Sequence, residues 1–239
     1  MQAAHAAIEA SLQDEVMESM ESNSSVDVDT IEVRDWKFNG GYISFLPKNK
    51  TASIGFIFYP GANVQAEAYA PVLKQIAEQG ISVFAVRQPF KMAVFGYDRA
   101  QFIIEKYSHQ IKLWSVGGHS LGGIGATFAG KSFQDEFAGI VLWASYPTLF
   151  SRIDQTNLRA LSISAELDGL TRQRELEAFK KYLPKNSYFY EIKGGNHTQF
   201  GSYKEKPQFG DNKASITRSQ QQSITARETA NFLKSLAAP

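Results

Sequence analysis

The chain contains no cysteine, no long apolar run and almost no net charge. Without cysteine there is no disulfide framework, no thiolate metal site and no cysteine nucleophile. A bilayer-spanning helix needs about 18 or more consecutive apolar residues, and no such stretch occurs, so we expect no membrane span. The formal net charge is +1, which lacks the positive field that drives general binding to nucleic acid. These absences favour a small molecule as the partner.

The length and composition are those of one globular domain. The 239 residues are 43% hydrophobic and 21% charged, which excludes an intrinsically disordered chain. No internal repeat and no linker divides the sequence. We therefore expect one core.

Residues 1–25 differ in character from the rest. They hold five acidic residues and no Lys or Arg, so they lack the basic start of a secretion signal, and we expect a cytoplasmic location. Ile8, Leu12, Val16 and Met20 recur every fourth residue, the spacing of one helical face. We predict an N-terminal amphipathic helix over 1–25, packed on a domain that spans 26–239.

Strand-like and helix-like patterns alternate from residue 26 onward. Two runs on either side of Asn39-Gly40-Gly41 predict an antiparallel pair. Six further strands are predicted at 53–59, 81–86, 113–116, 139–144, 161–164 and 188–192. Five helices are predicted at 66–79, 98–110, 121–131, 171–182 and 217–236. The alternation predicts an α/β fold whose mostly parallel sheet has helices on both faces and binds ligands at the carboxyl ends of its strands.

A Gly-x-Ser-x-Gly sequence follows the strand predicted at 113–116. It reads Gly118-His119-Ser120-Leu121-Gly122, and a predicted helix begins at once. Small neighbours permit a tight strand-to-helix turn that presents the serine hydroxyl above the sheet. The pattern predicts Ser120 as a nucleophile. The alternative interpretation is a glycine-rich turn without reactivity.

A reactive serine needs a base to remove its proton and an acid to orient the base. The chain has four histidines. His197 lies in a glycine-rich loop after the last strand, where a base must arrive, whereas the His119 side chain should project in a different direction from Ser120. Asp168 directly follows the strand 161–164 and is the predicted acid. The competing acids are Glu166 and Asp154.

The negative oxygen of a tetrahedral intermediate needs two backbone N–H donors. The amide after the nucleophile, Leu121, is one candidate. The loop Pro60-Gly61-Ala62 lets the backbone approach closely, so we expect Ala62 to supply the other donor, with Asn63 as second choice. The alternative interpretation of Gly61 is that it serves only to form a turn.

The residues around Ser120, from Gly117 to Gly123, resemble the α/β-hydrolase superfamily. More narrowly, four segments resemble a small bacterial branch related to dienelactone hydrolases. They are Tyr59-Pro60-Gly61, Ala68-Tyr69-Ala70-Pro71, Leu142-Trp143-Ala144-Ser145-Tyr146-Pro147 and Gly194-Gly195-Asn196-His197 with Phe200-Gly201. The resemblance implies a three-layer α/β-hydrolase fold, the triad Ser120, Asp168 and His197, and esterase-like hydrolysis. Residues 202–209 depart from this branch, which has a short glycine-containing turn after the histidine.

Aromatic residues in the loops at the catalytic edge predict an apolar pocket. The expected pocket residues are Asn63, Phe90, Phe95, Tyr146 and Phe200. The segment between Ser145 and Leu158 is too short for a large cap domain, so the pocket should be shallow and open. No His-Glu-x-x-His motif or calcium loop occurs, and we expect neither a metal nor a cofactor.

The sequence thus predicts a serine hydrolase that cleaves carboxylic esters or related acyl bonds of a small apolar substrate through an acyl-enzyme. An acyltransferase or thioesterase would share that intermediate. A non-catalytic ligand-binding protein on the same fold is the alternative from another class. Gly125 to Ser132 matches the phosphate-binding pattern G-x-x-x-x-G-K-S, but it lies inside a predicted helix and not after a strand. The oligomeric state is left open.

Overall fold

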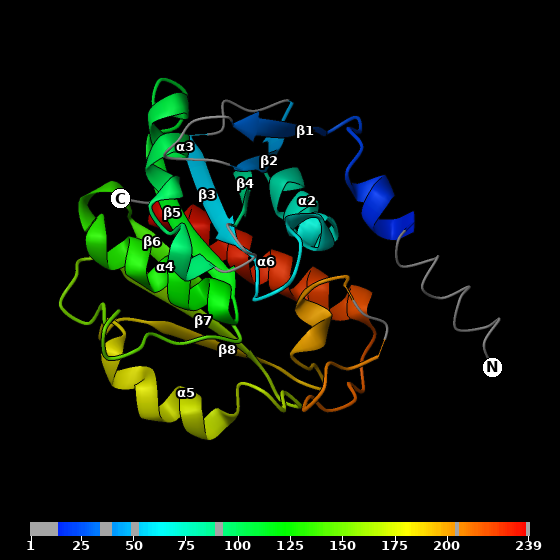
Figure 1. Ribbon diagram of the computed structural model, residues 1–239, viewed down its shortest axis with the longest axis vertical. Helices are drawn as coiled ribbons and strands as arrows, with labels where there is room; N and C mark the ends of the chain where they lie inside the picture. Colours follow the sequence, from blue (N-terminus) through cyan, green and yellow to red (C-terminus); the bar gives the residue numbers. More distant parts are fainter. Residues whose placement is uncertain (1–13, 34–39, 49–52, 89–92, 204–205, 238–239) are drawn as a thin grey trace.

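One sheet of eight strands organises the molecule. The computed structural model describes residues 14–33, 40–48, 53–88, 93–203 and 206–237. The strands are β1 (Val26–Val33), β2 (Gly40–Pro47), β3 (Ile54–Tyr59), β4 (Ser82–Arg87), β5 (Leu113–His119), β6 (Gly139–Trp143), β7 (Arg159–Ala165) and β8 (Tyr188–Ile192). Their order in the sheet is β1-β2-β4-β3-β5-β6-β7-β8 (Figure 1). β2 pairs antiparallel with β1 and β4, and the other neighbours pair in parallel, which confirms the mostly parallel α/β sheet.

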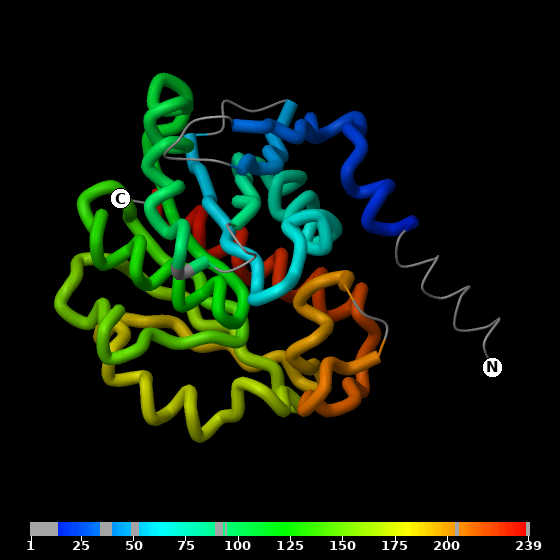
Figure 2. Tube along the Cα trace, viewed as in Figure 1, coloured from blue at the N-terminus to red at the C-terminus, as the bar shows by residue number. Residues whose placement is uncertain are grey.

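Helices cover both faces of this sheet, so the predicted three layers are confirmed (Figures 1 and 2). The α-helices that follow β3 are α2 (Ala70–Glu78), α3 (Arg99–Tyr107), α4 (Leu121–Ser132), α5 (Gln173–Phe179) and α6 (Arg218–Leu236). Side chains of α2 and α6 share one hydrophobic cluster, and those of α3 and α4 share the cluster on the opposite face. Within the described ranges, none of the helices has both the length and the apolarity that crossing a membrane requires.

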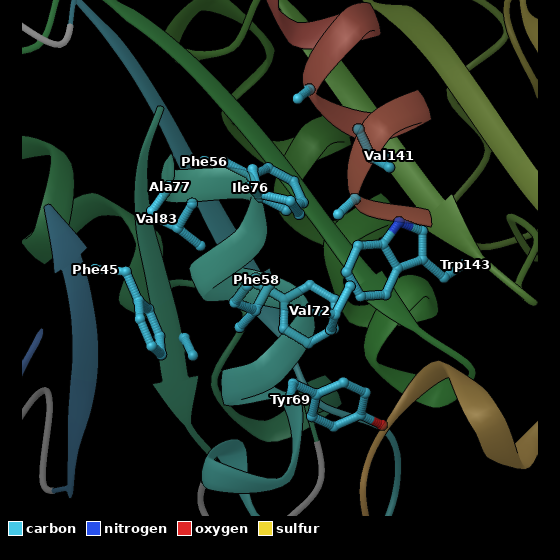
Figure 3. Close-up of a cluster of buried hydrophobic side chains, with 14 of the residues drawn as sticks. Phe45, Phe56, Phe58, Tyr69, Val72, Ile76, Ala77, Val83, Val141 and Trp143 are labelled. Atoms are coloured by element: carbon cyan, nitrogen blue, oxygen red, sulfur yellow. The ribbon is translucent and has the colours of Figure 1, made fainter. Parts of the chain in front are cut away.

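β3 lies in the middle of the core, as the burial of all six of its residues shows. Phe56 and Phe58 alternate with Ile57 and Tyr59, so the strand supplies aromatic or branched side chains to both faces. Full burial of such a side chain stabilises the fold by about 1.5 to 3 kcal/mol relative to exposure. The Phe58 ring lies 4.7 Å from that of Trp143 and 4.9 Å from that of Tyr69 (Figure 3). This core fixes the position of Tyr69, which matters for the site below.

Two differences from the predicted elements have clear physical causes. The predicted helix 66–79 divides into a 3-10 turn, η1 (Ala66–Tyr69), and α2, whose first turn holds Pro71. Proline fits the first helical turn because the missing N–H has no partner there anyway. β5 continues to His119, beyond the predicted end at 116, because Gly117 and Gly118 pair with β3 and β6. A side chain at Gly117 would collide with the Val141 carbonyl, so that glycine serves close packing within the sheet.

Of the predicted N-terminal helix, the structure describes a helical segment at residues 14–19. Lys74 Nζ on α2 donates to the carbonyls of Glu18 at 3.3 Å and Glu21 at 2.6 Å. Asn23 Nδ2 donates to the Glu78 carboxylate at 3.0 Å. The first turns of the predicted helix lie outside the described residues, so a helix over 1–25 stays a prediction.

Candidate active site

Ser120 occupies the turn between β5 and α4 in a strained conformation. Its φ of 53° and ψ of −125° lie in a region that non-glycine residues rarely adopt, at a cost of about 1 to 3 kcal/mol. The Ser120 amide donates to the Trp143 carbonyl at 3.0 Å, and the Ser120 carbonyl accepts from Ser145 Oγ at 2.7 Å and from the Gly123 amide at 3.0 Å. These backbone bonds hold the turn. The Ser120 side chain is half-buried, and its hydroxyl makes no hydrogen bond within the described ranges.

The flanking glycines let two backbones touch at this turn. A side chain at Gly122 would collide with the carbonyls of Tyr59 and Pro60, and one at Gly118 would collide with Gly122. The start of α4 therefore lies directly against the end of β3. This contact brings the Leu121 amide and the loop after β3 to the same place.

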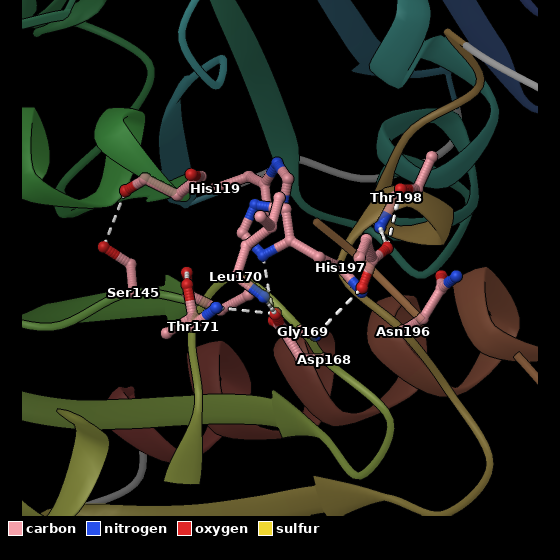
Figure 4. Close-up of polar contacts among 12 residues, drawn as sticks. His119, Ser145, Asp168, Gly169, Leu170, Thr171, Asn196, His197 and Thr198 are labelled. Atoms are coloured by element: carbon pink, nitrogen blue, oxygen red, sulfur yellow. Dashed lines mark hydrogen bonds and ion pairs between the residues drawn. The ribbon is translucent and has the colours of Figure 1, made fainter. Parts of the chain in front are cut away.

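His197 and Asp168 form a buried pair. His197 Nδ1 lies 2.8 Å from Asp168 Oδ2, and only 3% and 1% of the two side chains are exposed (Figure 4). Asp168 Oδ1 accepts the backbone N–H groups of Leu170 at 2.8 Å and Thr171 at 2.6 Å. With one oxygen held by two amides, the other oxygen is left for the imidazole. An ionised carboxylate only accepts hydrogen bonds, so His197 Nδ1 is the donor and Nε2 carries the lone pair.

The two competing carboxylates contact other groups. Glu166 Oε2 accepts the Gly194 amide at 2.8 Å, and this backbone hydrogen bond lowers the pKa of Glu166. Asp154 accepts two hydrogen bonds from Arg152, at 2.7 and 2.6 Å, and these lower the pKa of Asp154. Among the three acids that the sequence offers, Asp168 is therefore the one that contacts His197.

Asp211 is a site residue that the sequence analysis missed. Its Oδ1 accepts the amides of Gly169 at 3.0 Å and His197 at 3.3 Å. Its Oδ2 accepts the Thr198 amide at 2.8 Å and the Thr198 hydroxyl at 2.7 Å. One carboxylate thus joins the loop of the acid to the loop of the histidine. No motif or periodicity marks it, because its partners lie 42 and 14 residues away along the chain.

The two amides expected to bind an oxyanion are free. Neither the Leu121 N–H nor the Ala62 N–H donates to another residue in the ranges that the structure describes. The loop of Ala62 is closed by a bond from the Val64 amide to the Gly61 carbonyl at 3.2 Å. Asn63, the second choice, is exposed at a φ of 60°.

The predicted pocket residues within the described ranges differ in exposure and in their neighbours. Phe90 lies outside the described residues, and the side chain of Phe95 is 63% exposed. Phe200 is fully buried, 5.3 Å from the His119 ring, so it supports the site from behind and offers no surface to a substrate. Tyr146 stacks on Phe179 at 4.5 Å and lines a cavity of about 130 Å³ between α5 and the strands β7 and β8.

Comparison with known proteins defines the class to which this fold and site belong. The family model described as the alpha/beta hydrolase family matches residues 55–223, and the chain is a member of that family. The match concerns the family as a whole, and the narrower dienelactone-hydrolase-like branch stays a prediction. No curated protein matches the sequence significantly.

Solved structures with the same fold are distant in sequence. A hyperthermophilic esterase from the archaeon Pyrobaculum calidifontis aligns with a TM-score of 0.66 at 18% identity, over 100% of this chain and 94% of that one. A structure titled arylesterase gives 0.68 at 10% identity, over 96% and 90%. Est1E from Butyrivibrio proteoclasticus gives 0.64 at 12% identity, over 89% and 99%. At these identities the likeness is one of fold.

Proposed function

We propose that the protein is a serine hydrolase that cleaves carboxylic esters or related acyl bonds of small apolar molecules. Ser120 is the nucleophile, His197 the base and Asp168 the acid that orients the base. The observation that carries the proposal is the buried hydrogen bond of 2.8 Å between His197 Nδ1 and Asp168 Oδ2. The His197 ring lies 4.4 Å from the ring of His119, the residue that precedes Ser120.

The pairing defines the path of the proton. His197 Nε2 takes the proton of the Ser120 hydroxyl as the oxygen attacks the substrate carbonyl, and returns it to the leaving alcohol. Water then attacks the acyl-enzyme while His197 Nε2 takes a proton from it, and this proton is returned to the Ser120 oxygen as the acid leaves. Asp168 stays ionised and stabilises the imidazolium that forms. Hydrogen bonds of this kind are often long or absent without substrate, which agrees with the unbonded Ser120 hydroxyl.

The Leu121 and Ala62 amides bind the negative oxygen of the tetrahedral intermediate. Both lie where α4 meets the end of β3, and both lack an acceptor within the described part of the chain. Removing one such donor typically raises the barrier by about 3 to 4 kcal/mol. The family and the two structures named as an esterase and an arylesterase are consistent with this chemistry.

The test combines turnover with labelling. The wild-type protein should hydrolyse short nitrophenyl esters and take up a fluorophosphonate probe at Ser120, located by mass spectrometry of the peptides. Ser120→Ala should lose about 10⁴-fold or more in kcat, as expected for one member of a cooperating triad. Ser108→Ala, which removes an exposed serine hydroxyl on α3's carboxyl side, is the matched control and should keep full activity.

Two results would refute the proposal. Equal turnover by wild type and Ser120→Ala would show that Ser120 is not the nucleophile. Binding of an ester with no turnover, unchanged in Ser120→Ala, would instead identify a ligand-binding protein. Competing alcohols added to the assay separate hydrolysis from acyl transfer, because a transferase forms the new ester.

A further inference from the structure

A second buried imidazole lies beside the first. His119 is 1% exposed, and its Nδ1 lies 2.8 Å from the Tyr69 hydroxyl. The same ring lies 4.4 Å from the His197 ring between centroids. The proposed mechanism uses neither His119 nor Tyr69.

The Tyr69 hydroxyl also contacts the loop of the oxyanion amides. It accepts the Gly61 backbone N–H at 3.1 Å. A side chain at Gly61 would lie 3.0 Å from the Tyr69 hydroxyl and 3.1 Å from His119 Nδ1, so the backbone of the loop rests directly on this contact. A side chain at Gly61 would crowd this contact, so Gly61 contributes to packing as well as to the turn. Its neighbour in the chain is Ala62.

The direction of these hydrogen bonds follows from counting protons. A phenol has one proton, and its oxygen already accepts the Gly61 N–H. If His119 Nδ1 also donated, the phenol proton would be buried without an acceptor, because Tyr69 contacts no third polar partner within the described ranges. His119 Nε2 has no hydrogen-bond partner within the described ranges under either tautomer, so donation from Tyr69 to His119 Nδ1 is the arrangement that pairs the phenol proton. A neutral His119 then carries its proton on Nε2.

We propose that Tyr69 is a positioning residue for hydrolysis: its hydroxyl holds the oxyanion loop through Gly61 and fixes His119 as the Nε2-protonated tautomer that packs against His197. The inference rests on the proposed function. In this arrangement one side chain, that of Tyr69, sets the distance between the loop of the oxyanion amides and the loop of the base. Tyr69 is suited to this because its ring is fully buried and held against Phe58.

The arrangement also keeps a second positive charge away from the base. Burial lowers the pKa of His119 well below its usual value, and the charge on a protonated His197 lowers it further, while the His197 backbone acts in the opposite direction. His119 accordingly stays neutral while His197 gains the serine proton. A protonated neighbour at 4.4 Å would oppose that step.

The decisive experiment compares Tyr69→Phe with Tyr42→Phe. Tyr42 is equally buried, and its hydroxyl lies 3.3 Å from that of Tyr107, in the core on the opposite face of the sheet. Tyr69→Phe should reduce kcat for a nitrophenyl ester by about tenfold or more with KM nearly unchanged, because displaced groups lose transition-state contacts. Tyr42→Phe should keep the wild-type kcat even where its urea midpoint falls by a similar amount.

Nitrogen NMR of the ring tests the tautomer without any substrate. In the wild type, His119 should show a protonated Nε2 and an unprotonated Nδ1 that accepts a hydrogen bond, and Tyr69→Phe should shift the Nδ1 signal. A protonated Nδ1 in the wild type, or a Tyr69→Phe protein with wild-type kcat, would overturn the inference. Failure of the proposed function is recognisable separately, since wild type and Ser120→Ala would then be equally inactive.

Discussion

Two imidazoles, those of His119 and His197, lie 4.4 Å apart and are both buried, yet they face opposite kinds of partner. His197 donates to the carboxylate of Asp168, which can stabilise a positive charge on the ring. His119 accepts from the phenol of Tyr69, which brings no negative charge to stabilise a protonated ring. Burial is common to both rings. The partner decides which ring can receive a proton during the reaction.

The strongest way to break this contrast is to change the partner of His197. Asp168→Asn keeps the shape but presents an amide, which allows the wrong imidazole tautomer, and kcat should fall by about 10⁴-fold. Asp154→Asn and Glu166→Gln are matched controls, because those carboxylates face Arg152 and Gly194. Steady-state kinetics on one nitrophenyl ester measures all three. A similar loss in the controls would mean that Asp168 has no special relation to His197.

A smaller effect should follow from loosening the loop of His197 without touching its ring. Asp211→Asn removes an acceptor oxygen from the set that holds Gly169, His197 and Thr198. Because Asp211 is half-buried, we expect a loss of about 0.5 to 1.5 kcal/mol in the free energy of unfolding, the usual net contribution of one hydrogen bond. The fall in kcat should exceed that of Asn23→Ala, which removes a side-chain acceptor of two backbone amides beside β1, at the opposite edge of the sheet from β8 and the loop of His197. Urea titration and kinetics on both variants decide; equal kinetic effects would contradict a role for Asp211 in placing the base.

The smallest effect concerns the neutral ring and is seen in the pH dependence of stability. The pKa of His119 is lowered in the folded protein, whereas a histidine in the unfolded chain has a pKa of about 6.5. Below that pH the unfolded chain binds a proton that the folded chain does not, so the free energy of unfolding falls as the pH falls. The slope from this one group approaches about 1.4 kcal/mol per pH unit.

Unfolding by urea at several pH values between about 7 and 5 measures that slope, above the range in which ordinary carboxylates titrate. His119→Gln should lose this component of the slope even if its absolute stability is lower. His109→Gln, which removes an exposed histidine, is the control for the loss of one imidazole. Identical slopes for wild type and His119→Gln would show that His119 is not held neutral by the fold.

The sequence was sufficient for the fold because the fold depends on local patterns. Buried strands such as β3 appear as short apolar runs, and the alternation with helices predicts a parallel sheet. Boundaries failed where tertiary contacts override local preference. Gly117 and Gly118 look like the beginning of a turn, yet they extend β5 because only glycine fits between the neighbouring strands.

The site was predictable to the extent that its chemistry is carried by motifs. Order and loop position singled out His197 and Asp168, and the structure pairs them at 2.8 Å. The roles of Ser120 and of the amides of Leu121 and Ala62 stay predictions until turnover is measured. The cytoplasmic location is a separate prediction that turnover does not test. Asp211 and Tyr69 were not found because each acts through contacts with backbone amides, and any residue type can supply an amide. Phe200 was misjudged because exposure of an aromatic side chain is a tertiary property.

The direct contact between Gly122 and the carbonyl of Tyr59 has a consequence for engineering the protein. Because main chain meets main chain there, any side chain at residue 122 would collide with the carbonyls of Tyr59 and Pro60 and force α4 and the end of β3 apart. A mutant library aimed at new substrates should therefore hold this junction constant and diversify exposed loop positions such as Asn63 and Phe95. Selection would then act on which molecules enter, with the reactive geometry inherited unchanged.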